Sequence, residues 1–138
     1  MTSKISGLIL FCAFLVFVAA CKPTDKTTYN SIVKERDAIL SELLKAQEAR
    51  ADAGLCDPQE LMAARLALFT FRRDTANSKE EKIKQQELII GLHEKQIEFI
   101  KLQTTTGVAT RVTLLEATDR LLQERQLLEE LRLGLRKR

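Results

Sequence analysis

The C-terminal part of the chain repeats leucine every seven residues, at Leu114, Leu121, Leu128 and Leu135. This spacing places the four side chains along one side of an α-helix, where they must be buried against another helix. A second series at the same spacing lies upstream: Ile83, Ile90 and Ile97. The two series predict helices over about 79–103 and 110–136 that pack together.

Composition agrees with a chain built of long amphipathic helices. The 138 residues include five Gly and two Pro, only 5% are aromatic, and 30% are charged. Another apolar stripe predicts a helix over about 28–52: Ile32, Val33, Ile39, Leu40, Leu43, Leu44 and Ala46. We expect it to end at Gly54, which suits a left-handed C-cap, with Asp57 as the next N-cap and Pro58 in the first turn.

The helix that begins near residue 58 is followed by a stretch without large apolar side chains. Ser78 and Glu81 match a capping box, in which the serine accepts from a first-turn amide and the glutamate reaches back. We therefore expect a break near Asn77; one uninterrupted helix over about 58–103 is the alternative. The predicted fold is an all-α, antiparallel bundle of three or four helices.

The N-terminus has the features of a targeting segment. Lys4 precedes an apolar run over 7–18 that is shorter than the about 20 residues of a transmembrane helix. The run ends in Val18-Ala19-Ala20-Cys21, which resembles the lipobox of bacterial lipoproteins. The resemblance implies cleavage between Ala20 and Cys21, with diacylglycerol and acyl lipid attached to Cys21. An uncleaved N-terminal anchor is the alternative.

The lipobox divides the chain into a signal peptide (1–20), a lipidated tether (21–27) and a helical domain (28–138). The tether is polar and contains a proline, as expected of a flexible connection. Lys22 stands where enteric lipoproteins that stay in the inner membrane carry aspartate. The expected location is therefore the bacterial envelope, at the periplasmic face of the outer membrane.

Two segments of the helical domain resemble each other at an offset of 53 positions. The matched pairs are Gly54 with Gly107, Leu61 with Leu114, Met62 with Leu115, Ala64 with Ala117, and Leu68 with Leu121. Each copy is a turn glycine, a short polar loop and a new helix. The repeat units therefore start near 54 and 107, and chance agreement between two Leu/Ala-rich helices is the alternative.

Segments 54–65 and 107–117 resemble the repeat of TolC-type outer-membrane efflux proteins, whose helical hairpins turn at a glycine. In that family the turns contact periplasmic adaptor proteins. The resemblance implies docking residues at Gly54, Leu55, Gly107, Thr110 and Arg111. The chain departs from the family because it has no room for the strands of a membrane barrel, which excludes a channel made from one such chain.

Enzymatic motifs are absent from the sequence. His93 is the only histidine and has no cysteine or histidine at ligand spacing, so we expect neither a metal nor another dissociable cofactor. Cys56 has no intramolecular partner if Cys21 is lipidated, and a lone thiol in a turn is preferred to pairing with a second chain. The net charge of +3 combines 22 basic and 19 acidic residues, which disfavours nucleic acid as a partner.

The sequence therefore predicts a non-enzymatic, lipid-anchored envelope protein that binds other helices. In one hypothesis, the glycine turns dock a periplasmic adaptor or a TolC-type channel. In the other, the chain is a structural coiled-coil lipoprotein that associates with itself. A relic of a longer efflux protein is a third reading. No small-molecule substrate is expected.

Overall fold

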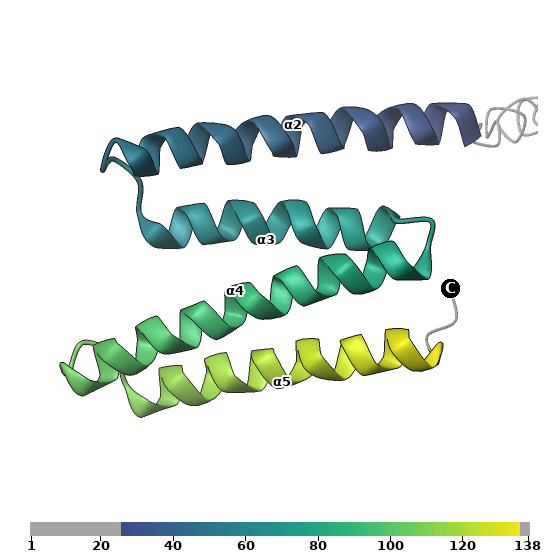
Figure 1. Cartoon of the computed structure of the whole chain (residues 1–138). Coiled ribbons are helices and arrows are strands. Elements are labelled where there is room, and N and C mark those ends of the chain that lie inside the picture. Colours follow the sequence, from purple (N-terminus) through teal and green to yellow (C-terminus); the bar gives the residue numbers. More distant parts are fainter. Residues whose placement is uncertain (1–25, 136–138) are drawn as a thin grey trace, which may run out of the picture. The chain divides into compact units, whose positions relative to one another are not determined.

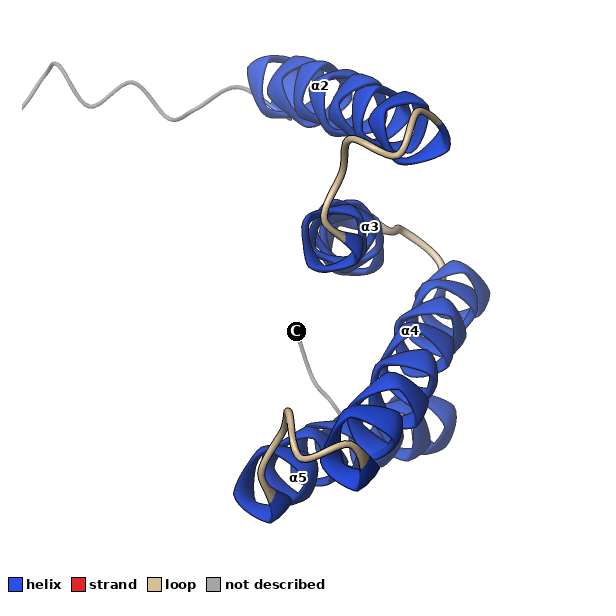
Figure 2. Ribbon diagram, turned by 90° about the vertical axis from the view of Figure 1, so that its left-hand side faces the viewer, coloured by secondary structure: helices blue, strands red, loops and turns tan. Residues whose placement is uncertain are grey.

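Residues 26–135 of the computed structural model are described, and within them every regular element is a helix (Figures 1 and 2). The helices are α2 (Lys26–Asp52), α3 (Pro58–Thr75), α4 (Lys79–Thr105) and α5 (Arg111–Leu133). This confirms the all-α prediction with four helices. The expected signal peptide, Ala20 and Cys21 lie outside the described residues. None of the four helices is long and apolar enough to cross a membrane.

The chain divides into two compact units, 1–34 and 35–138. In the first unit the described residues, 26–34, are helical, and Tyr29 and Ile32 are exposed. Lys26 and Thr27 therefore belong to α2 and not to an extended tether. The rest of this description concerns the second unit.

The predicted break near Asn77 is confirmed, because α3 ends at Thr75 and α4 begins at Lys79. Ser78 caps α4 by accepting a hydrogen bond from the Glu81 amide at 3.1 Å. The reciprocal half of the capping box is wrong: the Glu81 carboxylate accepts from the Gln85 side chain at 2.9 Å.

The end of α5 corrects the predicted helix over 110–136. Gly134 takes a left-handed conformation (φ 69°) and ends the helix at Leu133. The backbone amide of Leu135 then donates to the Glu130 carbonyl at 3.0 Å, which satisfies the last turn. Leu135 is therefore exposed beyond the helix and does not extend the heptad.

The core between α4 and α5 contains the remaining members of both heptad series. Its buried cluster is Ile90, Ile97, Ile100, Ala117, Leu121 and Leu128, with Ile83, Ala109 and Leu114 packed against it. This confirms that the two helices pack together. Four apolar residues that are not members of the two heptad series are exposed on these helices: Leu88, Phe99, Leu115 and Leu122.

A buried polar network joins α3, α4 and α5. The fully buried Gln86 side chain donates to the carbonyl and the carboxylate of Glu124, at 2.8 and 2.7 Å. Its oxygen accepts from Arg73 Nη1 at 2.8 Å. Both the nitrogen and the oxygen of the Gln86 side-chain amide are hydrogen-bonded. The network therefore sets the register of α3 and α5 on α4.

We predict that Gln86→Leu lowers the free energy of unfolding by about 1–3 kcal/mol, because buried hydrogen bonds to charged groups are lost and their partners stay desolvated. The control is Gln123→Leu on the exposed face of α5, which should change it by less than about 0.5 kcal/mol. Urea denaturation followed by circular dichroism measures both. Equal stability of the two variants would contradict a structural role for the network.

Helix α2 has no buried residue, and part of its apolar stripe is half-buried. Polar side chains also connect it to α3. Arg72 donates to both carboxylate oxygens of Asp37, at 2.7 and 3.0 Å, and Arg65 pairs with Glu48 at 3.0 Å. The hydrogen bond from Arg72 lowers the pKa of Asp37. Only one side of the apolar stripe therefore turns toward α3.

Candidate docking site at the two glycine turns

The turn between α2 and α3 is built by backbone hydrogen bonds around Gly54. Gly54 has a φ of 72°, its amide donates to Ala51, and the Leu55 amide donates to Arg50 at 2.8 Å. This pair of bonds is the Schellman motif, which glycine favours because it has no Cβ. Asp57 then caps α3 by accepting from the Gln59 amide at 2.8 Å, as predicted.

The turn between α4 and α5 has the same construction. Gly107 has a φ of 77°, its amide donates to Thr104, and the Val108 amide donates to Gln103 at 2.8 Å. Thr110, three residues after the glycine, caps α5 by accepting from the Thr113 amide at 3.2 Å. Thr110 therefore has a structural role, whereas the sequence placed it among the docking residues.

The 53-residue offset extends beyond the turns to whole helices. Adding 53 to the bounds of α2, Lys26–Asp52, gives those of α4, Lys79–Thr105. One hydrogen bond between the two helices of a hairpin also recurs at this offset. Arg72 of α3 donates to the Ser41 hydroxyl of α2 at 3.0 Å, and the equivalent Arg125 of α5 donates to the Glu94 carboxylate of α4 at 2.8 Å. The two segments therefore share the helix bounds of α2 and α4, the start of α3 and α5, and one contact at this offset, whereas α5 is longer than α3.

Both turns lie at the same end of the successive antiparallel helices (Figure 1). Leu55 and Val108, which directly follow the two glycines, are 71% and 73% exposed. In a Schellman motif this residue frequently packs on the preceding helix. Because neither side chain is covered, each turn presents an open aliphatic group that an apolar protein surface can bury.

Two further apolar residues near the second turn are exposed. Leu102 belongs to the last turn of α4, and Val112 belongs to the first turn of α5. Arg111, the first residue of α5, is exposed and makes no salt bridge within residues 26–135. The sequence predicted Leu55 and Arg111 here but missed Leu102, Val108 and Val112. The repeat itself was the available signal, because Val108 is the equivalent of Leu55.

Other candidate sites contain no convergent chemistry. The Cys56 thiol is half-buried and donates to the Gln47 side-chain oxygen at 3.2 Å, so it is part of the first turn. His93 is buried on α4 beside Gln96, at 3.3 Å. Within residues 26–135, no three potential metal-ligand side chains gather.

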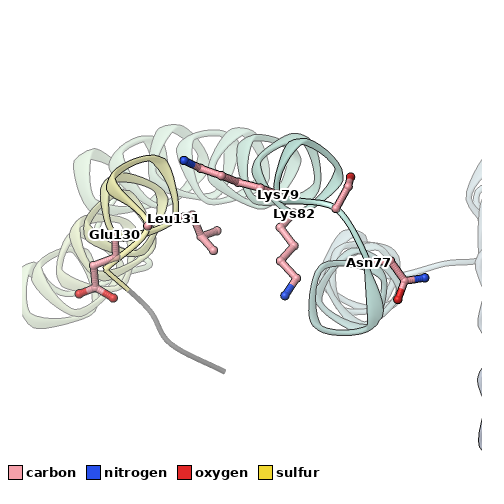
Figure 3. Close-up of a pocket in the computed structure, with 7 residues that line it drawn as sticks. Asn77, Lys79, Lys82, Glu130 and Leu131 are labelled. Atoms are coloured by element: carbon pink, nitrogen blue, oxygen red, sulfur yellow. The ribbon is translucent and has the colours of Figure 1, made fainter.

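A recess of about 280 Å³ lies at the other end of α4 and α5 (Figure 3). Its lining residues are Asn77, Ser78, Lys79, Lys82, Glu130, Leu131 and Gly134. The Lys79 ammonium donates to the Arg132 carbonyl at 2.7 Å, which stabilises the C-terminus of α5. The charged groups of Lys79, Lys82 and Glu130 point in different directions, so they do not form a ligand site (Figure 3).

No family model, curated protein or solved structure matches this chain. The choice of the glycine turns as the candidate site rests on the backbone geometry and side-chain exposure described above.

Proposed function

We propose that this chain is a lipid-anchored protein of the bacterial envelope that uses its two glycine turns to bind another protein. The observation that carries the proposal is the matched exposure of Leu55 and Val108 on two turns of the same construction. Among residues 26–135, Leu55 and Val108 are the two most exposed large apolar side chains. A partner that buries both turns accounts for their duplication.

The anchor and the turns lie on opposite sides of α2 in the sequence, with Cys21 before this helix and Gly54 after it. The anchor holds the protein on a membrane, and the turns are the part that meets a partner.

The proposed partner is an envelope protein whose own helical hairpins present an apolar surface. The likeness of 54–65 and 107–117 to TolC-type repeats favours a periplasmic adaptor or an outer-membrane channel protein. The proposal does not include transport by this chain.

Photo-crosslinking in intact cells tests the docking proposal. A photoreactive phenylalanine at Leu55 or Val108 is expected to capture the same envelope protein, whereas the equally exposed Leu133 at the opposite end of α5 should not. Leu55→Asp with Val108→Asp should then reduce co-purification of that protein by about tenfold or more, since charge replaces a buried apolar contact.

Equal adducts from all three positions would refute docking at the turns. Capture of an envelope protein other than an adaptor or channel would retain docking and remove the efflux connection. The matched control Leu133→Asp should leave co-purification unchanged.

A further inference from the structure

Helix α4 is covered on two different faces. One face carries Ile90 and Ile97 into the core with α5. The other carries Ile89 and Leu92, which are buried but lie outside that core, and α3 is the second helix packed on α4. Helix α4 therefore uses one face within its hairpin with α5 and another face toward α3 of the preceding hairpin.

Helix α2 has the same second face, but without a neighbour. By the 53-residue offset, Ile39 of α2 corresponds to Leu92 of α4, and Leu43 corresponds to Gln96. Leu92 is buried, whereas Ile39 is 58% exposed and Leu43 is also exposed. The side of α2 that carries Ile39 and Leu43 is therefore apolar and open, although Arg36 takes the place of the buried Ile89.

Helix α5 has the complementary open face. On α3, Arg73 reaches Gln86 of α4, and the half-buried Met62 and Phe69 share the Arg73 side of the helix at three-four spacing. Their equivalents on α5 are Leu115 and Leu122. Both are exposed, Leu122 at 56%, although the corresponding residues of α3 are half-buried.

We propose that α5 of one copy packs on α2 of a second copy, which repeats between chains the α3–α4 contact made within one chain. The open face of α2 corresponds to the face of α4 that packs on α3. The open face of α5 corresponds to the face of α3 that packs on α4. Charge is complementary, because Asp119 lies between Leu115 and Leu122 on α5, and Arg36 lies one turn before Ile39 on α2. The Arg36 guanidinium also lies 4.8 Å from the Phe71 ring of its own chain. The contact joins different surfaces of the two copies, so association is head-to-tail.

This self-association uses residues away from Leu55 and Val108 and is independent of docking at the turns. Its test is sedimentation of the full chain in density-matched detergent at micromolar concentration. The wild type is expected to associate. Ile39→Glu and Leu122→Glu should each weaken association by about tenfold or more, because a charge enters an apolar contact.

Mixing the two variants distinguishes a head-to-tail contact from a symmetric one. A Leu122→Glu chain retains the α2 face and an Ile39→Glu chain retains the α5 face, so their equimolar mixture is expected to form heterodimers although each alone is monomeric. The control Leu88→Glu, on an exposed face of α4, should associate like the wild type. Circular dichroism should show equal helix content in all variants.

A monomeric wild type would overturn the proposal, and so would loss of association in only one of the two variants. A mixture that stays monomeric would overturn the head-to-tail arrangement. Because the variants leave Leu55 and Val108 intact, failure here does not bear on docking at the turns.

Discussion

Replacing Ile89 by alanine is expected to lower the free energy of unfolding by about 2–5 kcal/mol. Ile89 is 1% exposed, the most completely buried apolar side chain among residues 26–135. The substitution removes three carbons and leaves a cavity in a contact between helices. Because domains of this size are stable by only about 5–15 kcal/mol, this loss is a large fraction of the total.

The matched control for this prediction is the adjacent residue on the same helix. Leu88 is 42% exposed, so Leu88→Ala should change the free energy of unfolding by less than about 0.5–1 kcal/mol, from partial burial alone. Both variants are compared with the wild type by urea denaturation at one protein concentration. Similar losses in the two variants would show that Ile89 is not buried as described.

Changing Cys21 to serine is expected to abolish lipid attachment and leave the precursor uncleaved. The thioether to diacylglycerol requires a sulfur nucleophile, and a hydroxyl is far less nucleophilic at neutral pH. Loss of the acyl chains also removes the membrane affinity that buried methylenes supply, about 0.8 kcal/mol each. Metabolic labelling with a radioactive fatty acid, together with gel mobility, measures both effects.

Cys56→Ser is the control for the lipid anchor, because Cys56 lies in the turn before α3 and outside the lipobox. It should be labelled and cleaved like the wild type. Normal processing of Cys21→Ser, or loss of labelling in Cys56→Ser, would refute the lipobox assignment.

Local signals predicted the helix ends with good accuracy. Asp57 and Ser78 accept the first-turn amides that their positions implied, and Gly54 has the left-handed conformation that ends α2. These features depend on hydrogen bonds within a few residues, so a short stretch of sequence contains all the information they need. The end of α5 was missed because the heptad was extended through Gly134, although that glycine carried the same signal as Gly54.

Burial was predicted less well, because periodicity gives the direction of a side chain around its helix but not the presence of a neighbour. The stripe over 32–46 has the period of an amphipathic helix, yet Ile39 and Leu43 within it are exposed. Leu115, Leu121 and Leu122 are all leucines of α5, but only Leu121 lies on the side of the helix that α4 covers. Leu121 is therefore buried, whereas Leu115 and Leu122 are exposed. The same limit applies to the candidate site. The two glycine turns were predicted from the sequence, but the solvent exposure of the Val108 side chain was not.

The sequence alone predicted an all-α chain of three or four amphipathic helices, where most of them begin and end, and a likeness between two segments at a 53-residue offset. It also contains a segment that resembles a lipobox, on which the proposed anchor rests. Only the tertiary structure decided which apolar faces are covered, that α2 meets α3 through Asp37 and Arg72, and that Gln86 joins three helices. The reason is physical: helix caps are satisfied within a few residues, whereas burial depends on segments far apart in the chain.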